Sequence, residues 1–264
     1  MLTEALDFRD ESEELFQLIS PHSDDVFQRP TLFKGWTVND VLTHLHTWNW
    51  AANASLNDDP EFTEMVVAVT PAAMKGELRT FENARYVDLT GRELLETWHS
   101  YAQEVAENFH QADAKKRVKW AGPDMSARSS ITARLMETWA HGQAIYDLLG
   151  VERKSTDRIK NIVFLGLNTF GWSFKVQGQE IPAEVPYLRL TAPSGEIWEW
   201  NDPASSNQIS GSAEAFCQVV TQTRNIGDTS LKVSGDIATR WMDSAQCFAG
   251  RAEAPPPTGA RHVV

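Results

Sequence analysis

The sequence predicts an all-α four-helix bundle followed by a smaller α+β domain. Four long helical patterns occupy the first 150 residues, whereas strand-like alternation mixed with shorter helical patterns follows them. The 264 residues are enough for two domains of about 100–150 residues each. We expect the bundle over residues 1–152, the α+β domain over 153–250 and a flexible, proline-containing tail over 251–264.

Capping residues mark the ends of the predicted bundle helices. Thr37 precedes an apolar helical stripe and has Asp40 three residues later, which resembles a capping box. Thr90 with Glu93 forms a similar start, and Gly150 stands where a left-handed glycine ends a helix. The last bundle helix is expected to start at Ser126 or Ser129. The expected helices cover residues 9–20, 37–54, 90–111 and 126–149, with a broken segment over 60–81.

The second half of the chain contains a predicted β-hairpin. Residues 187–191 alternate between apolar and polar side chains, a Pro193-Ser194-Gly195 turn follows, and residues 197–200 alternate again. The other expected elements are helices over 155–174, 211–222 and 236–248 and a strand over 230–234.

Composition excludes several classes of function. The formal net charge is −12 and no basic cluster is present, which argues against nucleic acid and anionic membrane surfaces as partners. No apolar run approaches the roughly 20 residues of a membrane-spanning helix. Cys217 and Cys247 are too few for a disulfide scaffold, and the N-terminus turns acidic at once, without a signal peptide. We therefore expect a cytoplasmic protein in which both cysteines are small buried residues.

Three side chains from two helices are candidate metal ligands. Glu137 and His141 are one helical turn apart and project from the same face. His44 lies on the apolar row of the helix over 37–54. Two histidines and one glutamate form a known catalytic zinc set that leaves the fourth position to water or substrate. The alternative interpretation is a surface Glu–His contact beside a hydrogen-bonded core histidine.

The other polar and aromatic candidates favour structural roles. Arg134 precedes Glu137 by three residues, which favours an ordinary ion pair. Trp120 is the one tryptophan expected at a pocket wall, whereas the tryptophans on helical stripes are expected in the core. His99 is the spare candidate for a fourth metal ligand. We expect the remaining histidines, together with His99, at the surface: His22, His46, His110 and His262.

Two motifs resemble a known family. The run Gly35–Leu45 is similar to the first signature of DinB-like bundles and, more narrowly, of the mycothiol-dependent maleylpyruvate isomerase family. The run Arg134–His141 resembles that family's second signature. The C-terminal half resembles its second domain, through Trp198-x-Trp200, Gly211 and residues 233–236, so the resemblance covers nearly the whole chain.

The resemblance implies a metal centre and a catalytic cation. It implies that His44, Glu137 and His141 bind a divalent metal, usually zinc, and that Arg224 lies near the reaction centre. Two departures matter. Ala144 stands where the family often has an aspartate three residues after its second histidine, so a hydrogen bond to a ligand is lost or rerouted. The loop 121–129 is typical of relatives without an assigned reaction.

Three functional hypotheses follow. The first is a metal-dependent isomerase or thiol transferase in which a low-molecular-weight thiol (mycothiol, glutathione or bacillithiol) attacks a small electrophile whose carboxylate pairs with Arg224. The second is a non-catalytic metal-binding or small-ligand-binding protein, favoured if a fourth side chain closes the metal shell. The third is a metal-free assembly scaffold. The sequence leaves the oligomeric state open, a homodimer included.

Overall fold

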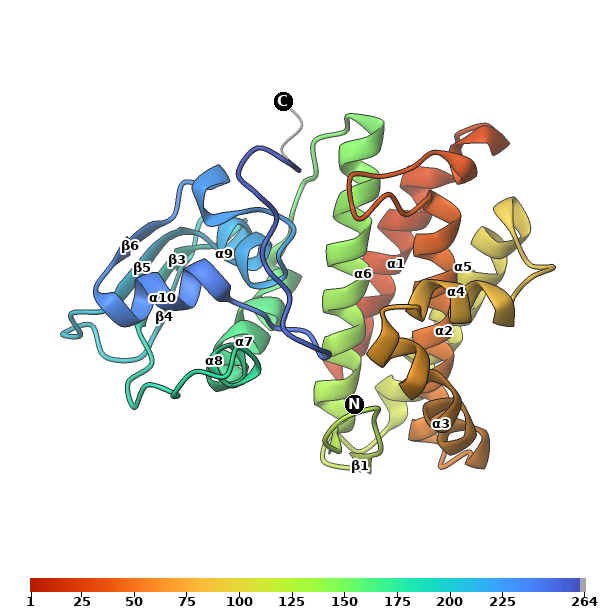
Figure 1. Ribbon diagram of the computed structural model, residues 1–264, viewed down its shortest axis with the longest axis horizontal. Coiled ribbons are helices and arrows are strands. Elements are labelled where there is room, and N and C mark those ends of the chain that lie inside the picture. The colour runs from red at the N-terminus through yellow and green to blue at the C-terminus, as the bar shows by residue number, and fades with distance from the viewer. Residues whose placement is uncertain (262–264) are drawn as a thin grey trace. The chain divides into compact units, whose positions relative to one another are not determined.

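The computed structural model describes residues 1–261 and divides the chain into two compact units, Met1–Leu149 and Gly150–Val264. The predicted fold class is confirmed, because the first unit is helical and the second contains a small sheet (Figure 1). Residues 262–264 lie outside the described residues, and so do the predictions made for His262 and for that end of the tail.

Four long helices form the bundle and run side by side in Figure 1. Each of the four helices carries its apolar residues on one face, because residues three and four apart share a face of a helix, and this face points into the bundle. Shorter elements join them. The four are α1 (Thr3–Ile19), α2 (Val38–Leu56), α5 (Gly91–Gln111) and α6 (Ala127–Leu149). The connecting elements are η1 (Asp24–Gln28), α3 (Pro60–Lys75), α4 (Leu78–Arg85), β1 (Arg117–Val118) and β2 (Met125–Ser126).

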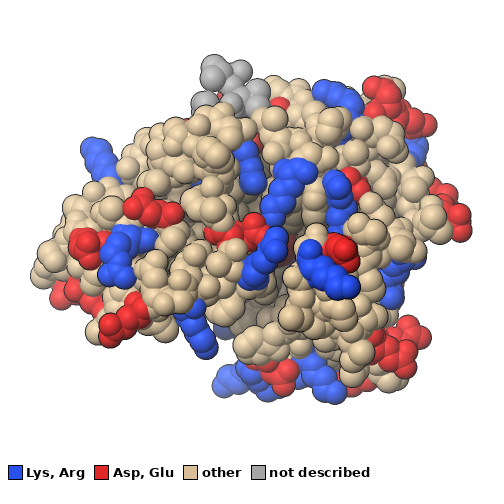
Figure 2. All heavy atoms as spheres, in the orientation of Figure 1, with Lys and Arg blue, Asp and Glu red and all other residues tan. Residues whose placement is uncertain are grey.

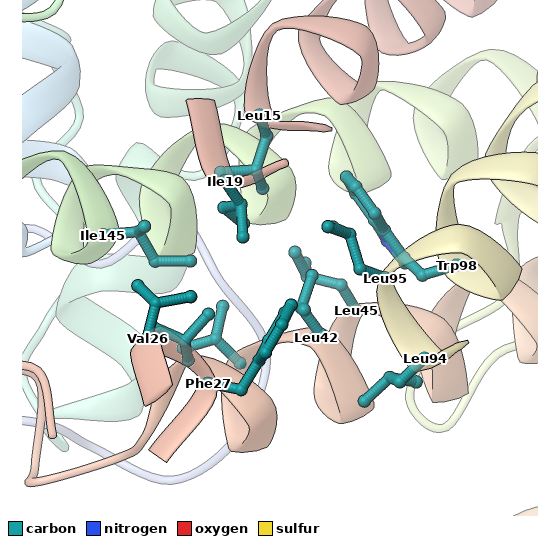
Figure 3. Close-up of a cluster of buried hydrophobic side chains, with 12 residues drawn as sticks. Leu15, Ile19, Val26, Phe27, Leu42, Leu45, Leu94, Leu95, Trp98 and Ile145 are labelled. Atoms are coloured by element: carbon teal, nitrogen blue, oxygen red, sulfur yellow. The ribbon is translucent and has the colours of Figure 1, made fainter. Parts of the chain in front are cut away.

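One buried cluster unites every long helix of the bundle. Figure 3 shows its side chains converging from α1, η1, α2, α5 and α6. Its members are Leu15, Ile19, Val26, Phe27, Val38, Val41, Leu42, Leu45, Leu94, Leu95, Trp98 and Ile145. Burial of such side chains stabilises the fold by about 1.5–3 kcal/mol each. The cluster therefore fixes α2 against α6, the two helices that carry the candidate metal ligands.

The caps of the bundle helices differ in quality. Thr37 and Asp40 form a complete capping box: the Asp40 N–H donates to Thr37 Oγ1 over 3.1 Å, and the Thr37 N–H donates to Asp40 Oδ2 over 2.9 Å. Thr90 occupies the cap position of α5 but accepts no hydrogen bond through its side chain. Ser126 accepts from the Ser129 N–H, and Gly150 adopts φ +67° after α6, as expected.

The segment expected to be broken forms two helices instead. Asp59 caps α3, Pro60 occupies its first turn, and Gly76 ends it at φ +76°. Proline is favoured in the first turn of a helix and glycine directly after the last turn. Pro60 and Gly76 therefore mark the two ends of a helix, although the sequence suggested a broken segment. α4 follows at once, and its single fully buried residue is Glu82.

The second unit is built on a four-stranded sheet with strand order β4-β3-β5-β6. The predicted hairpin is present, with Leu190 opposite Trp198. β5 pairs parallel to β3, and β6 pairs antiparallel to β5. The strands are β3 (Tyr187–Thr191), β4 (Ile197–Trp200), β5 (Gln208–Ser212) and β6 (Lys232–Ser234). The helical elements are η2 (Asp157–Ile159), α7 (Lys160–Asn168), α8 (Phe170–Val176), α9 (Ala213–Val220), η3 (Ile226–Asp228) and α10 (Asp236–Ser244).

Two expectations for this unit were wrong in detail. The helix expected over 155–174 is interrupted at Thr169, which separates α7 from α8. The helix expected from residue 211 begins at Ala213, because Ser212 caps it by accepting from the Ala215 N–H. Gly211 instead lies within strand β5 at φ +148°, where an added Cβ would lie 2.9 Å from Leu231. Only glycine fits this close approach without strain.

The described part of the C-terminal segment is hydrogen-bonded to the second unit. The Glu253 N–H donates to Gln246 Oε1, Asn225 donates to the Pro256 carbonyl, and the Gly259 N–H donates to Asp228. These bonds hold residues 251–261 against the unit at several points.

Charged side chains of both signs are interspersed on the face drawn in Figure 2. Within residues 1–261, no helix has both the length and the apolarity that crossing a bilayer requires.

Replacement of Thr37 by alanine tests the capping box. We expect Thr37→Ala to lower the free energy of unfolding by about 1 kcal/mol, because the Asp40 N–H loses the hydroxyl oxygen that accepts from it. The matched control is Thr90→Ala, which removes no side-chain cap and is expected to cost less than about 0.5 kcal/mol. Urea denaturation of the full-length, metal-free chain measures both. Equal losses in the two variants would contradict this account of α2.

Candidate metal centre

The structure brings His44, Glu137 and His141 together between α2 and α6. His44 Nε2 lies 3.6 Å from Glu137 Oε2, and His141 Nε2 lies 3.2 Å from the same oxygen. One ligand atom from each residue falls within 4.8 Å of the other two. α2 contributes one ligand and α6 contributes two a single turn apart, as the helical spacing predicts. Both imidazoles are largely buried, with side-chain exposures of 9% and 11%.

The separations fit one small tetrahedral ion. Zinc bonds to imidazole nitrogen and carboxylate oxygen at about 2.0–2.2 Å, so two ligands of a tetrahedral site lie about 3.3–3.6 Å apart. The distance from Glu137 Oε2 to His44 Nε2, 3.6 Å, lies in that range, and the distance to His141 Nε2, 3.2 Å, lies just below it. Imidazole nitrogen with one carboxylate is also a donor set that zinc prefers. These residues could therefore hold the ion with little movement.

Aromatic rings enclose the three ligands. Trp36 stacks on His141 with ring centroids 5.7 Å apart and meets His44 edge-on at 5.4 Å. Phe33 packs edge-on against His141 at 4.9 Å. Trp48 lies 6.3 Å from His44. Trp36 and Trp48 were expected to be ordinary core residues. The periodicity of apolar residues along a helix does not predict that they contact the two histidines.

Burial and charge act in opposite directions on the ligands. For Glu137, desolvation opposes ionisation, but the contacts with His141 and His44 hold its pKa well below the usual range. For His44, desolvation lowers the pKa, yet the charges of Glu82 and Glu137 outweigh it and raise the pKa to about 9. Desolvation dominates at His141 and lowers its pKa. These shifts favour the charged forms of Glu137 and His44 and the neutral form of His141.

Glu82 is a functional candidate that sequence reasoning missed. Its Oε1 lies 2.9 Å from His44 Nδ1 and 2.7 Å from Trp48 Nε1, and its side chain is only 1% exposed. It stands among Arg79 and Arg85 on α4, so the sequence shows only an ordinary charged helix. No local signal distinguishes it, because its burial comes from the docking of α4 on α2.

Comparison with known proteins identifies the family. The family model of the mycothiol maleylpyruvate isomerase N-terminal domain matches residues 8–146, more than half of the chain. The chain belongs to this family. The prediction drawn from the two signature motifs is confirmed, and the matched region contains all three candidate ligands.

Relatives and one solved structure extend the likeness over nearly the whole chain. An uncharacterized protein of Mycobacterium tuberculosis, found in strains CDC 1551 and H37Rv, is 35% identical over 246 residues, covering 92% of this chain and 94% of that protein. The crystal structure of the mycothiol-dependent maleylpyruvate isomerase matches with a TM-score of 0.56 at 16% identity, covering 96% of this chain and 95% of that chain. At that identity the likeness shows a shared fold.

Arg134 does not form the expected ion pair with Glu137. It is 2% exposed and donates from Nε to Asn49 Oδ1 over 3.1 Å. Desolvation lowers the pKa of its guanidinium to about 10, against the raising effect of the Glu137 and Glu82 charges. A buried cation thus offsets two carboxylates of this mycothiol maleylpyruvate isomerase-type domain, rather than forming a surface contact.

The other histidines lie away from the three ligands. His46 was expected at the surface, but it is 8% exposed and packs between Tyr86 and Tyr101. Burial lowers its pKa to about 4, assisted by the nearby Arg85 charge. His99, the spare ligand candidate, contacts Glu13 Oε2 at 2.7 Å. Within residues 1–261, the metal-ligand group has three members and His99 is not one of them.

The structure also shows where the remaining sequence candidates lie. Trp120 packs against Trp48 and Phe62, at the edge of an apolar cluster. Arg224 follows α9 in the second unit, is 7% exposed, and caps that helix through its backbone N–H to the Gln218 carbonyl. Nη1 of Arg224 donates to the Thr223 carbonyl. Cys217 and Cys247 are both buried, which confirms the prediction for both.

Removal of the buried cation tests the charge balance of the centre. We expect Arg134→Met to destabilise the metal-free, full-length protein by about 3 kcal/mol, because the buried Glu82 and the partly buried Glu137 lose a compensating charge. Arg128→Met is the control, since Arg128 pairs with Glu4 at an exposed position and should cost less than about 1 kcal/mol. Guanidinium denaturation compares the two. An Arg134 variant no less stable than the Arg128 variant would refute the compensating role.

Proposed function

We propose that this protein is a metal-dependent enzyme that uses a low-molecular-weight thiol to isomerise, or to transfer the thiol to, a small electrophilic substrate. Its family membership suggests thiol-dependent isomerase chemistry. The observation that carries the proposal is the convergence of His44, Glu137 and His141 on one ion-sized point. We propose zinc as the metal, because two imidazoles and one carboxylate are a set that zinc uses in enzymes.

An open coordination position favours catalysis over a purely structural metal. Structural zinc sites have four protein ligands, whereas catalytic sites keep one position for water or substrate. The candidate group has three ligands among the described residues. His99, which would have closed the shell, is engaged with Glu13 elsewhere on α5 and α1. The alternative is a non-catalytic metal-binding protein. A fourth protein ligand that closed the coordination shell of the metal would have favoured that alternative.

The charges around the centre favour an anion in the open position. Glu82 and Glu137 supply two negative charges, Arg134 supplies one positive charge, and a divalent ion supplies two more. One positive charge is left over in a largely buried site if both histidines are neutral. A bound zinc ion lowers the pKa of a thiol that coordinates it, so that the thiolate is available at neutral pH. A thiolate would neutralise the site.

The surrounding residues prepare the site for an anionic nucleophile. Glu137 and His141 are held at a fixed spacing by one turn of α6, which limits the geometry to a small range. The rings of Phe33, Trp36 and Trp48 pack against the two histidines and cover part of the site. A low local dielectric strengthens the attraction between the cationic centre and an anion.

We further propose that Arg224 pairs with a carboxylate of the substrate. A guanidinium recognises a carboxylate through two parallel hydrogen bonds, which fixes the orientation of the substrate as well as its charge. Arg224 is buried at 7% exposure, and burial strengthens such a bond. The thiol can be mycothiol, glutathione or bacillithiol, and the assay below distinguishes them.

Zinc stoichiometry tests the metal centre. We expect protein purified without a histidine tag to bind one zinc ion per chain, and His141→Ala to weaken binding at least about 100-fold because one of three ligands is lost. His99→Ala is the matched control and should bind as the unmodified protein does. Competition with a chromogenic chelator measures the affinity. Equal zinc affinity in the two variants would place the metal elsewhere.

Turnover with a panel of thiols tests the reaction. We expect the zinc-loaded protein to convert a maleyl-type α,β-unsaturated acid with one of the three thiols, and a chelator to abolish the rate. Arg224→Lys should lower kcat/KM by about tenfold or more for the acid but leave the rate with the corresponding methyl ester nearly unchanged, since the ester offers no carboxylate. Absence of metal-dependent turnover with all three thiols would favour the non-catalytic alternative.

A further inference from the structure

α4 places a carboxylate where an apolar side chain would be expected. Leu78 and Phe81 of this helix pack against a second apolar cluster, yet both stay partly exposed. The buried members of that cluster are Ala51, Ala54, Phe62, Met65 and Val69. Glu82 is the single fully buried residue of α4. Burial of an ionised group costs several kcal/mol unless its partners compensate. An apolar side chain at position 82 would be enough to pack α4 against α2. The carboxylate of Glu82 therefore has a role other than packing.

Two contacts of Glu82, with His44 and with Trp48, converge on one of its carboxylate oxygens. Oε1 accepts from Trp48 Nε1 over 2.7 Å and contacts His44 Nδ1 at 2.9 Å. A carboxylate only accepts hydrogen bonds, so Nδ1 of His44 is the donor and carries the proton. Nε2 of the same ring then turns toward Glu137, 3.6 Å away. Trp48 and His44 are one helical turn apart on α2, so a single carboxylate oxygen of Glu82 restricts the orientation of both side chains.

The second histidine lacks such a partner. Nδ1 of His141 is buried and has no hydrogen-bond partner among residues 1–261. Ala144, three residues beyond His141 on α6, offers no side-chain acceptor. The ring of His141 is oriented by packing against Phe33 and Trp36 instead. The hydrogen bonding that orients the ligands is therefore concentrated on His44.

We infer that Glu82 is the positioning residue of the metal centre, because it holds Nδ1–H of His44 and so directs Nε2 toward Glu137 and His141. This inference rests on the proposed metal-binding function and assigns a residue that the ligand set alone does not include. Carboxylates that accept from a metal-bound histidine fix its tautomer and make it a better electron donor. Loss of such a partner weakens metal affinity by about 10–100-fold.

The first test compares two glutamate-to-glutamine variants. Glu82→Gln keeps an oxygen that can accept from His44 and Trp48 but removes the charge. We expect its zinc affinity to fall by about 10-fold or more, with a changed visible absorption spectrum of the Co2+-substituted protein. Glu13→Gln is the matched control, because Glu13 forms the same kind of contact with His99 at 2.7 Å, outside the metal-ligand group. It should keep both the affinity and the spectrum.

The outcomes separate the two proposals. If the unmodified protein binds no zinc, both the proposed function and the role of Glu82 are overturned. If the unmodified protein binds zinc and Glu82→Gln binds it equally well with the same Co2+ spectrum, only the assignment to Glu82 fails. A purely structural role would lower thermal stability without moving the Co2+ spectrum of the folded fraction, and that result also overturns the assignment.

A second measurement needs no variant to fold. Long-range proton–nitrogen NMR of the unmodified, full-length protein with 15N-labelled histidine reports which ring nitrogen is protonated. After zinc addition we expect His44 to keep a slowly exchanging proton on Nδ1 while the Nε2 resonance shifts. Zinc bound through Nδ1 of His44, or a rapidly exchanging Nδ1 proton, would overturn the inference.

Discussion

Two carboxylates and two imidazoles meet between α2 and α6, largely out of contact with water. An uncompensated charge in such a place destabilises the folded state, and the surrounding residues offset the charges or cover them. Arg134 approaches from one turn earlier on α6, Glu82 approaches from α4, and aromatic rings cover the remaining faces. In the proposed function, a divalent ion together with a thiolate completes this balance. The large apolar cluster then serves to keep the two helices at a fixed separation.

The elements of the bundle follow from local chemistry. The complete capping box at Thr37 fixes where α2 begins, and therefore which face of α2 carries His44. Ser126 and Gly150 set the ends of α6 in the same way. Since the side chains of Glu137 and His141 lie one turn apart, their convergence on His44 needs only the correct contact between two helices. The apolar stripes of both helices specify that contact.

The sequence predicted the fold class and the three residues of the candidate centre, because helical periodicity and caps are local signals. It could not predict the residues that support them. Glu82 is one of several charges on a short helix, and only the docking of that helix makes it buried. Arg134 was expected to pair with Glu137 at helical spacing, but the neighbouring helix offers Asn49 as a better-placed partner. His46 was expected at the surface, and the two tyrosines that bury it are distant in sequence.

The same limit explains the errors in the second unit. Strand β5 is short and glycine-containing, and its parallel pairing with β3 requires a crossover that leaves no local pattern. Ser212 both ends this strand and caps α9, so one residue serves two elements. Pairing between distant segments decides such boundaries, whereas caps and periodicity describe only neighbours along the chain.

X-ray absorption at the zinc edge tests the central claim most directly. The zinc-loaded protein should show a first shell of nitrogen and oxygen donors that includes two imidazoles. Addition of the cofactor thiol should introduce one sulfur at about 2.3 Å without displacing either imidazole. A shell that already contains four protein donors, or one that gains no sulfur from any of the three thiols, would contradict the account.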